Sequence, residues 1–244
     1  MSDRLKNKVA IVTGAGSRGP GLGNGKATAI LFARAGARVL CVDQVLERAE
    51  ETVELIRGEG GEAAAFAADV THAVACDAMV QAAVARWGGL DVLHNNVGIE
   101  SRKDLLDTPE DEWDRVLAVD LKSMFLATRA AVPAMVARGG GSVVCVSSVA
   151  ALRGHGRTAY AAAKAGVIGF VRSVAVQLGA GASVSTRSRR APSGPRWSRA
   201  SGRRRASAGG APRCWARKAP AGTSRGAPST SRATRRAGSP ARRW

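Results

Sequence analysis

Short apolar runs alternate with segments of helical periodicity along the first three-quarters of the chain. The apolar runs are continuous rather than interrupted by polar residues at every second position, which is typical of strands buried on both faces. Strands are expected at Val9–Thr13, Arg38–Asp43, Ala63–Ala67, Val92–His94 and Ser142–Val146. Helices are expected at Gly25–Ala35, Leu46–Gly58, Ala73–Trp87, Glu110–Arg138 and Thr158–Leu178. This alternation predicts an α/β fold with a doubly wound parallel sheet covered on both sides.

The pattern stops after Leu178. The remainder is rich in Arg, Ser, Ala, Gly and Pro and has no apolar period, which by composition predicts disorder. We therefore expect an incomplete domain over residues 1–179, whose C-terminal strands are missing or disordered. A basic tail over residues 180–244 follows it.

The net charge of +18 and the pI of about 11.3 resemble those of a nucleic-acid-binding protein. The charge is unevenly distributed, however. Residues 180–244 hold 17 basic and no acidic side chains, whereas residues 1–179 hold 20 basic and 19 acidic ones. The main part of the chain is therefore nearly neutral, and its composition does not predict a nucleic-acid partner.

The four cysteines (Cys41, Cys76, Cys145 and Cys214) lack CxxC spacing. We expect reduced, mostly buried thiols in a cytoplasmic protein, without a disulfide framework or a metal site. The first residues run directly into a strand, so no signal peptide is expected. No apolar stretch is expected to reach the ~20 residues that span a bilayer, so no membrane association is expected either.

A glycine-rich loop lies between the first strand and the first helix. It runs Thr13-Gly-Ala-Gly-Ser-Arg-Gly-Pro-Gly-Leu-Gly-Asn-Gly25. Glycines let the backbone approach a pyrophosphate closely, and the N-terminus of the following helix favours its negative charge. The alternative is a flexible turn. The strand–loop–helix context favours a nucleotide site that includes Gly14, Ser17, Gly21, Gly23 and Gly25.

Asp43 ends the second strand, where a carboxylate accepts hydrogen bonds from the adenosine ribose hydroxyls of a dinucleotide. The same carboxylate would repel a 2′-phosphate, so NAD is favoured over NADP. Arg18 in the glycine-rich loop tempers this preference, because a basic side chain there could meet a phosphate.

A third group of residues predicts acid–base chemistry. Tyr160 and Lys164 are four residues apart and share one face of a helix. An ammonium close to a phenol favours the phenolate, which suits a group that moves a proton on or off a carbinol oxygen. Ser148 supplies a hydroxyl that can hydrogen-bond the same substrate oxygen.

Taken together, these residues resemble the short-chain dehydrogenase/reductase family over about residues 5–178. The motifs that carry the resemblance are the glycine-rich loop, Asp43, Asp69-Val70, Asn95-Asn96-Val97-Gly98, Ser147-Ser148 and Tyr160-Ala-Ala-Ala-Lys164. The resemblance implies a Rossmann fold and hydride transfer between a nicotinamide and a secondary alcohol or ketone. It also implies a homodimer or homotetramer formed through the long helices.

The resemblance assigns further roles to individual residues. Asp69 and Val70 would contact the adenine ring, and Asn96 and Gly98 would border the cofactor. Tyr160 and Lys164 would also contact it, the latter by holding the nicotinamide ribose.

The chain departs from the family pattern in three places. The glycine-rich loop is longer, with residues 18–22 read as an insertion. Asp120 stands where the family commonly has an Asn, and as the fourth member of the catalytic group it would add a carboxylate near Lys164. Ser148 precedes Tyr160 by 12 positions where 13 is usual, which leaves Ser147 as the alternative.

Two other functions stay open at this point. Asp120 and the shortened spacing would fit a dinucleotide-binding protein that has lost its chemistry. The tail would fit a nucleic-acid-binding arm in which Trp197, Trp215 and Trp244 stack on bases. A functionless linker is a further interpretation of the tail.

A reading-frame change explains the tail best. If each tail codon gives its first two bases to the second and third positions of a shifted codon, Ser183–Ser198 can be read as an apolar strand followed by Pro-Gly and Thr-Pro. The family has such a segment at this place. We hypothesise that the chain leaves its ancestral frame near Ala180–Ser183, and we expect this polypeptide to fold poorly and to have weak or no activity.

The nucleotide sequence around codons 178–200 tests this hypothesis. We expect an alternative frame that encodes the missing family segment. A verified gene without such a frame would contradict it. Soluble protein of normal yield and turnover would contradict the expected poor folding and weak activity.

Overall fold

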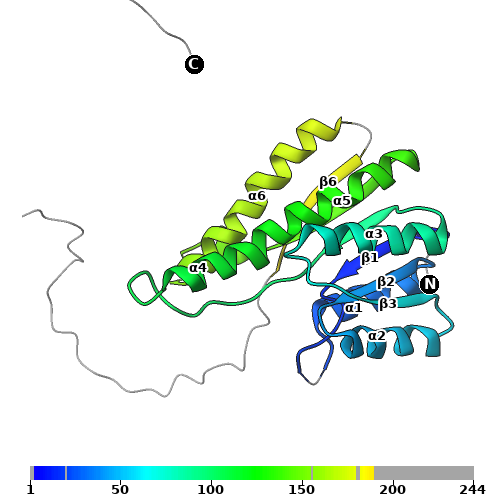
Figure 1. Cartoon of the computed structure of the whole chain (residues 1–244), viewed down its shortest axis with the longest axis horizontal. Helices are drawn as coiled ribbons and strands as arrows, with labels where there is room; N and C mark the ends of the chain where they lie inside the picture. The colour runs from blue at the N-terminus through cyan, green and yellow to red at the C-terminus, as the bar shows by residue number, and fades with distance from the viewer. Residues whose placement is uncertain (1–2, 20, 155, 180–181, 190–244) are drawn as a thin grey trace, which may run out of the picture. The chain divides into compact units, whose positions relative to one another are not determined.

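The computed structural model describes residues 3–19, 21–154, 156–179 and 182–189. In these residues six parallel strands form one sheet in the order β3-β2-β1-β4-β5-β6. Figure 1 labels β1, β2, β3 and β6 of this sheet. The strands are β1 (Val9–Thr13), β2 (Arg38–Asp43), β3 (Ala63–Ala67), β4 (Val92–Asn95), β5 (Gly141–Ser148) and β6 (Ala182–Arg189). This order is that of a doubly wound Rossmann sheet and confirms the predicted fold class.

Helices connect the strands and follow the predicted bounds closely. They are α1 (Asn24–Arg34), α2 (Leu46–Gly58), α3 (Ala73–Trp87), α4 (Glu110–Leu117), α5 (Ser123–Ala137) and α6 (Thr158–Leu178). Two short turns complete the set, the π-helical η1 (Ala118–Lys122) and the 3-10 helical η2 (Val149–Ala151).

The strands are buried on both faces, as their continuous apolar runs predict. Val9 and Ile11 of β1 pack into a core with residues of α3, α5 and α6. Ala10 and Val12 point the other way, into a core with residues of α1 and α2. Successive side chains of a strand alternate between faces, so one apolar run serves two layers.

The long helical region expected over residues 110–138 is not one regular α-helix. The π-helical turn η1 interrupts it between α4 and α5. A π turn inserts an extra residue into the helical path and so changes the direction of the side chains around it. Asp120 lies in this turn and is fully buried.

The expectation that the order of elements stops after Leu178 is wrong, because β6 follows α6. It lies alongside β5 over eight residue pairs, from Gly141 opposite Ala182 to Ser148 opposite Arg189. Strand pairing uses backbone groups that every non-proline residue carries, so a polar segment can extend a sheet without an apolar pattern. The edge of β5 is therefore covered, which removes one reason for the expected poor folding.

β6 belongs to the sheet although it lies beyond residue 179. Other expectations for the tail fall outside the described residues. These are the further strand, the disorder, Cys214 and the three tryptophans.

The expectation that no apolar stretch approaches the length of a membrane span is also wrong. α6 has 21 residues and a mean hydropathy of 1.3 over an 18-residue window, which meets the length and composition of a membrane span. Its many Ala and Val residues and its few charges raise this average. α6 nevertheless packs one side against β5 and β6, and 28% of that window is buried.

Asp91, just before β4, joins three parts of the fold at the amino ends of the strands. Its carboxylate accepts from the Val9 amide at 2.8 Å and lies 3.1 Å from both Lys8 Nζ and Arg138 Nε. Burial alone would raise the pKa of Asp91, but these three partners together lower it. The ionised carboxylate therefore stabilises the folded state.

We predict that Asp91→Asn lowers the free energy of unfolding by about 2 kcal/mol at pH 7, since hydrogen bonds to a charged group are lost. The folded pKa lies below the unfolded value of about 3.9, so the contribution is present above that pH and is lost as the pH falls through the folded pKa. Urea unfolding followed by tryptophan fluorescence measures both effects. Asp3→Asn removes an exposed pair with Lys6 and should leave stability unchanged. An equal loss at pH 7 and pH 3 would contradict the prediction.

Candidate active site

The glycine-rich loop between β1 and α1 brings two backbone segments into close contact. Gly14 has a φ of +64°, a conformation that favours glycine. A Cβ added to Gly25 would lie 1.8 Å from the Gly14 carbonyl oxygen and 2.6 Å from Asn96 Nδ2. Only glycine fits at position 25, and the first turn of α1 therefore lies directly against the end of β1.

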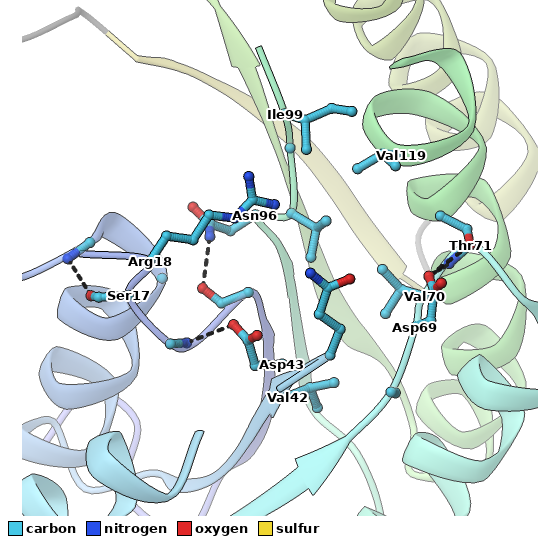
Figure 2. A pocket seen from close by; sticks show the side chains of 18 of the residues that line it. Ser17, Arg18, Val42, Asp43, Asp69, Val70, Thr71, Asn96, Ile99 and Val119 are labelled. Carbon is cyan, nitrogen blue, oxygen red and sulfur yellow. Dashed lines mark hydrogen bonds between the residues drawn. The ribbon is translucent and has the colours of Figure 1, made fainter. Parts of the chain in front are cut away.

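Hydrogen bonds fix the rest of the loop. Gly23, the residue before α1, donates its amide to Ser17 Oγ at 2.9 Å. Gly16 donates its amide to Asp43 Oδ2 at 3.2 Å. Figure 2 shows both contacts and the Arg18 side chain, which reaches from the loop toward Asn96.

Asp43 stands at the end of β2, as the sequence predicts for a ribose-binding carboxylate. Its Oδ1 accepts from the Val45 amide at 3.2 Å, and its Oδ2 faces Gly16. A Cβ on Gly16 would lie 2.9 Å from that oxygen. The loop and β2 are thus held together by one half-buried carboxylate.

A cavity of about 650 Å³ opens beside this loop, at the carboxyl ends of β1, β2 and β4 (Figure 2). Its position is the crevice where the strand order reverses, between β1 and β4, and ligands of doubly wound sheets bind there. The residues predicted for the cofactor that line it are Gly14, Ser17, Gly23, Gly25, Asp43, Asp69, Val70, Asn96 and Gly98.

Three predicted cofactor residues do not line this cavity. Gly21 is exposed in the loop with a φ of +102°. Tyr160 and Lys164 lie on α6, outside the lining. The cavity is therefore lined by the glycine-rich loop and Asp43 but not by Tyr160 or Lys164.

The sequence did not single out several lining residues. They are Gly16, Asn24, Val42, Gln44, Ala68, Thr71, Val97, Ile99, Arg115, Ala118 and Val119. Arg18 also lines the cavity, and the sequence predicted for it only a possible effect on the preference between NAD and NADP. Most are neighbours of predicted residues in the loops after β1, β2, β3 and β4, where proximity along the chain is a usable signal. Arg115, Ala118 and Val119 come from α4 and η1, and only the folded chain brings them here.

Asp69 and Val70 follow β3 and lie at the cavity, as the resemblance implied. Asp69 Oδ1 accepts from the amide and the hydroxyl of Thr71, at 2.9 and 2.7 Å. Partial burial would raise the pKa of Asp69, but the Thr71 hydrogen bonds and nearby His72 lower it overall. The turn after β3 is thereby held in one conformation.

Asn96 connects the loop after β4 to the end of β1. Its amide donates to Thr13 Oγ1 at 3.2 Å, and its Nδ2 donates to the carbonyls of Thr13 and Gly14 at 3.4 and 3.2 Å. Two residues later, a Cβ on Gly98 would lie 3.1 Å from both Lys164 Nζ and Asp120 Oδ2. The segment after β4 therefore joins the cavity to the residues on α6.

Lys164 is 3% exposed and makes three contacts. Its Nζ donates to the Val146 carbonyl at 3.3 Å, lies 3.1 Å from Asp120 Oδ2 and lies 5.8 Å from the centre of the Tyr160 ring. The i, i+4 spacing therefore brings the ammonium and the phenol together on one face of α6. This is the arrangement that acid–base chemistry at Tyr160 requires.

The two serines at the end of β5 have different environments. Ser147 donates its hydroxyl to the Lys164 carbonyl at 2.8 Å and is 2% exposed. Ser148 is 9% exposed, and its Oγ accepts from the Ala150 amide at 3.2 Å, which leaves its own proton to donate. These contacts favour Ser148 over Ser147 as the serine available to a substrate oxygen.

The remaining polar groups show no metal-binding arrangement. In the described part of the chain, no group of three His, Cys, Asp or Glu side chains is placed to hold a metal ion. Cys41, Cys76 and Cys145 are free and buried. Burial raises the pKa of the Cys41 thiol to about 12 and that of Cys76 to about 11, so these thiols are unreactive.

The fold and the site together define a dinucleotide-binding α/β protein. The close approach of Gly25 to Gly14 and the hydrogen-bonded loop before α1 form the cradle that a pyrophosphate requires. A carboxylate stands at the end of β2, and Lys164, beside the Tyr160 ring, donates to the Val146 carbonyl near the end of β5.

The sequence matches the short chain dehydrogenase family over residues 8–185. The chain belongs to the short-chain dehydrogenase/reductase family, which confirms the resemblance. Its relatives are dehydrogenases and reductases that act on alcohols and hydroxyacyl compounds. This chain is accordingly an NAD(P)-dependent oxidoreductase of the short-chain type, and it binds a nicotinamide dinucleotide.

Two curated relatives illustrate the range of activities among similar proteins. A 3-oxoacyl-[acyl-carrier-protein] reductase of Thermotoga maritima is 40% identical over 176 residues, which are 72% of this chain and 70% of that protein. A (3R)-3-hydroxyacyl-CoA dehydrogenase of Homo sapiens is 41% identical over 191 residues, which cover 73% of this chain and 70% of that one.

Solved structures agree with the fold. A short chain dehydrogenase from Mycobacterium smegmatis has a TM-score of 0.71 at 37% identity, over 77% of this chain and 79% of that one. A 7α-hydroxysteroid dehydrogenase in complex with NADH and 7-oxo glycochenodeoxycholic acid has a TM-score of 0.70 at 33% identity, over 77% and 71%.

We predict that Gly25→Ala lowers the affinity for NADH at least about tenfold, because its Cβ would force α1 away from the Gly14 carbonyl. A fluorescence titration with NADH measures the affinity. Gly19→Ala in the same loop is the matched control, since its Cβ would have no neighbour within 4 Å. Equal affinities for the two variants would contradict the assignment of this cradle.

Proposed function

We propose that this chain oxidises a secondary alcohol with NAD, or reduces the ketone with NADH, and that Tyr160, Lys164 and Ser148 carry the chemistry. The observation that supports this most directly is the contact of the Lys164 ammonium with the Tyr160 ring beside the end of β5. The bound nicotinamide supplies the hydride acceptor or donor.

Each of the three residues has a distinct role in this proposal. In oxidation, Tyr160 as phenolate takes the proton of the substrate hydroxyl while the hydride leaves the same carbinol carbon. Lys164 places a positive charge beside the Tyr160 ring, 5.8 Å from its centre. Ser148 donates its hydroxyl proton to the substrate oxygen and holds it close to Tyr160, because η2 after Ser148 packs against α6.

The preference for NAD over NADP is part of the proposal. Asp43 directs a carboxylate into the cavity at the end of β2, where it would accept from ribose hydroxyls and repel a 2′-phosphate. Arg18 also lines the cavity, but its side chain reaches toward Asn96 rather than toward Asp43 (Figure 2). This direction suits the pyrophosphate better than the adenosine ribose.

We also propose a homodimer or homotetramer in the cytoplasm. Phe125 and Val136 of α5 and Val176 of α6 are large apolar residues that are 44%, 58% and 84% exposed in the single chain. Contacts between subunits through these helices would cover them. The free, buried cysteines are consistent with a reducing compartment.

We predict that Tyr160→Phe lowers kcat/KM for alcohol oxidation by about 10²- to 10⁴-fold, because the proton acceptor is lost. NADH affinity should stay within about threefold, since the cradle at Gly25 is untouched.

Turnover of a panel of secondary alcohols by the unchanged chain should be faster with NAD than with NADP. Full activity of the variant would contradict the role of Tyr160, and faster turnover with NADP would contradict the role of Asp43.

A further inference from the structure

The carboxylate of Asp120 is placed in the catalytic group by the π-helical turn η1. The residue is fully buried, although it lies in the middle of a helical segment whose neighbour Asp114 is exposed. The irregular turn directs Asp120 toward the segment after β4 and toward α6.

Both oxygens of Asp120 have specific neighbours. Oδ1 accepts from the Ile99 amide at 2.8 Å, and Oδ2 lies 3.1 Å from Lys164 Nζ. Gly98 covers this ion pair, since a Cβ there would lie 3.1 Å from each of the two charged atoms. The side chains of Asp120 and Lys164 are 0% and 4% exposed, so water does not screen their charges.

The charged and titratable groups around the pair are few. Arg18 acts on Asp120 from the glycine-rich loop, and the Tyr160 ring lies beside Lys164 on α6. The buried thiol of Cys145 on β5 is close enough to feel the Lys164 charge. Burial raises the pKa of Asp120, while Lys164, the Ile99 amide and Arg18 oppose this rise.

The ion pair of Asp120 and Lys164 lies beside the Tyr160 ring. A buried ammonium needs a counter-charge, and a carboxylate at 3.1 Å provides one. A carboxylate that close to Lys164 also reduces the field of the ammonium at the neighbouring phenol. With an effective dielectric constant of about 20, one such charge shifts the pH midpoint at which a group several ångströms away ionises by about one unit.

We propose that Asp120 is an ionised positioning residue that pairs with Lys164 and offsets its charge at Tyr160, so that alcohol oxidation requires a more alkaline solution than an uncompensated lysine would. This proposal rests on the proposed role of Tyr160 as the acid–base. It assigns to Asp120 a control of the pH range of the enzyme rather than contact with the substrate.

The sequence offers a direct probe, because Tyr160 is the only tyrosine in the chain. Tyrosine labelled with ¹³C at Cζ gives a single NMR signal, which reports phenol ionisation in the full chain without any substrate. In Asp120→Asn, we expect the midpoint of this titration to move to lower pH by about one unit relative to the unchanged chain. Asp114→Asn removes an exposed carboxylate from the same helical segment and should move it by less than about 0.2 units.

Asp120→Ser provides a second neutral variant, in case the asparagine variant does not fold. An unchanged or higher midpoint in either folded neutral variant would overturn the proposal. Where turnover is measurable, the acidic limb of the kcat/KM profile for oxidation should move by the same amount as the midpoint.

The two proposals fail in different ways. If Tyr160→Phe keeps full activity while Asp120→Asn still moves the tyrosine signal, the role of Tyr160 is wrong and the charge offset stands. If Tyr160→Phe is inactive and the signal does not move, the charge offset is wrong and the role of Tyr160 stands.

Discussion

The pairing of β1 with β4 is the constraint on which the rest of the structure depends. The two strands are far apart in the chain, yet Ala10 lies opposite Val92 in a parallel register. Thr13 secures the carboxyl end, because its hydroxyl accepts from the Asn96 amide and donates to the His94 carbonyl. Asp91 secures the amino end through the Val9 amide. The crevice between the two strands is where the glycine-rich loop, Asn96 and Gly98 meet.

The two halves of the site differ in their electrostatics. The first half is the cavity, which is lined by glycines, by the carboxylates of Asp43 and Asp69 and by Arg18 and Arg115. The second half, on η1 and α6, holds the charges of Asp120 and Lys164 away from water. Gly98 lies at the boundary and contacts the second half while lining the first. Small changes in the segment after β4 would therefore affect both halves.

β6 shows the limit of reasoning from apolar patterns. Its sequence, Ala182 to Arg189, contains three serines, a threonine and two arginines, unlike the buried strands before it. It nevertheless extends the sheet, because the β5 backbone offers hydrogen-bonding groups whatever the neighbouring side chains are. The family match ends close by, at residue 185, so the sheet continues slightly beyond the recognisable sequence.

The sequence by itself determined the fold class, the family and most element bounds. Continuous apolar runs located β1 to β5, and the spacing of Tyr160 and Lys164 placed both on one face of a helix, since these signals depend on neighbours along the chain. Only the tertiary structure decided that Ser147 donates to the Lys164 carbonyl, that Asp120 faces Lys164 from a π turn, and that β6 joins the sheet. Such contacts join residues distant in sequence. They depend on strand order and on the direction in which each side chain points, which local patterns do not encode.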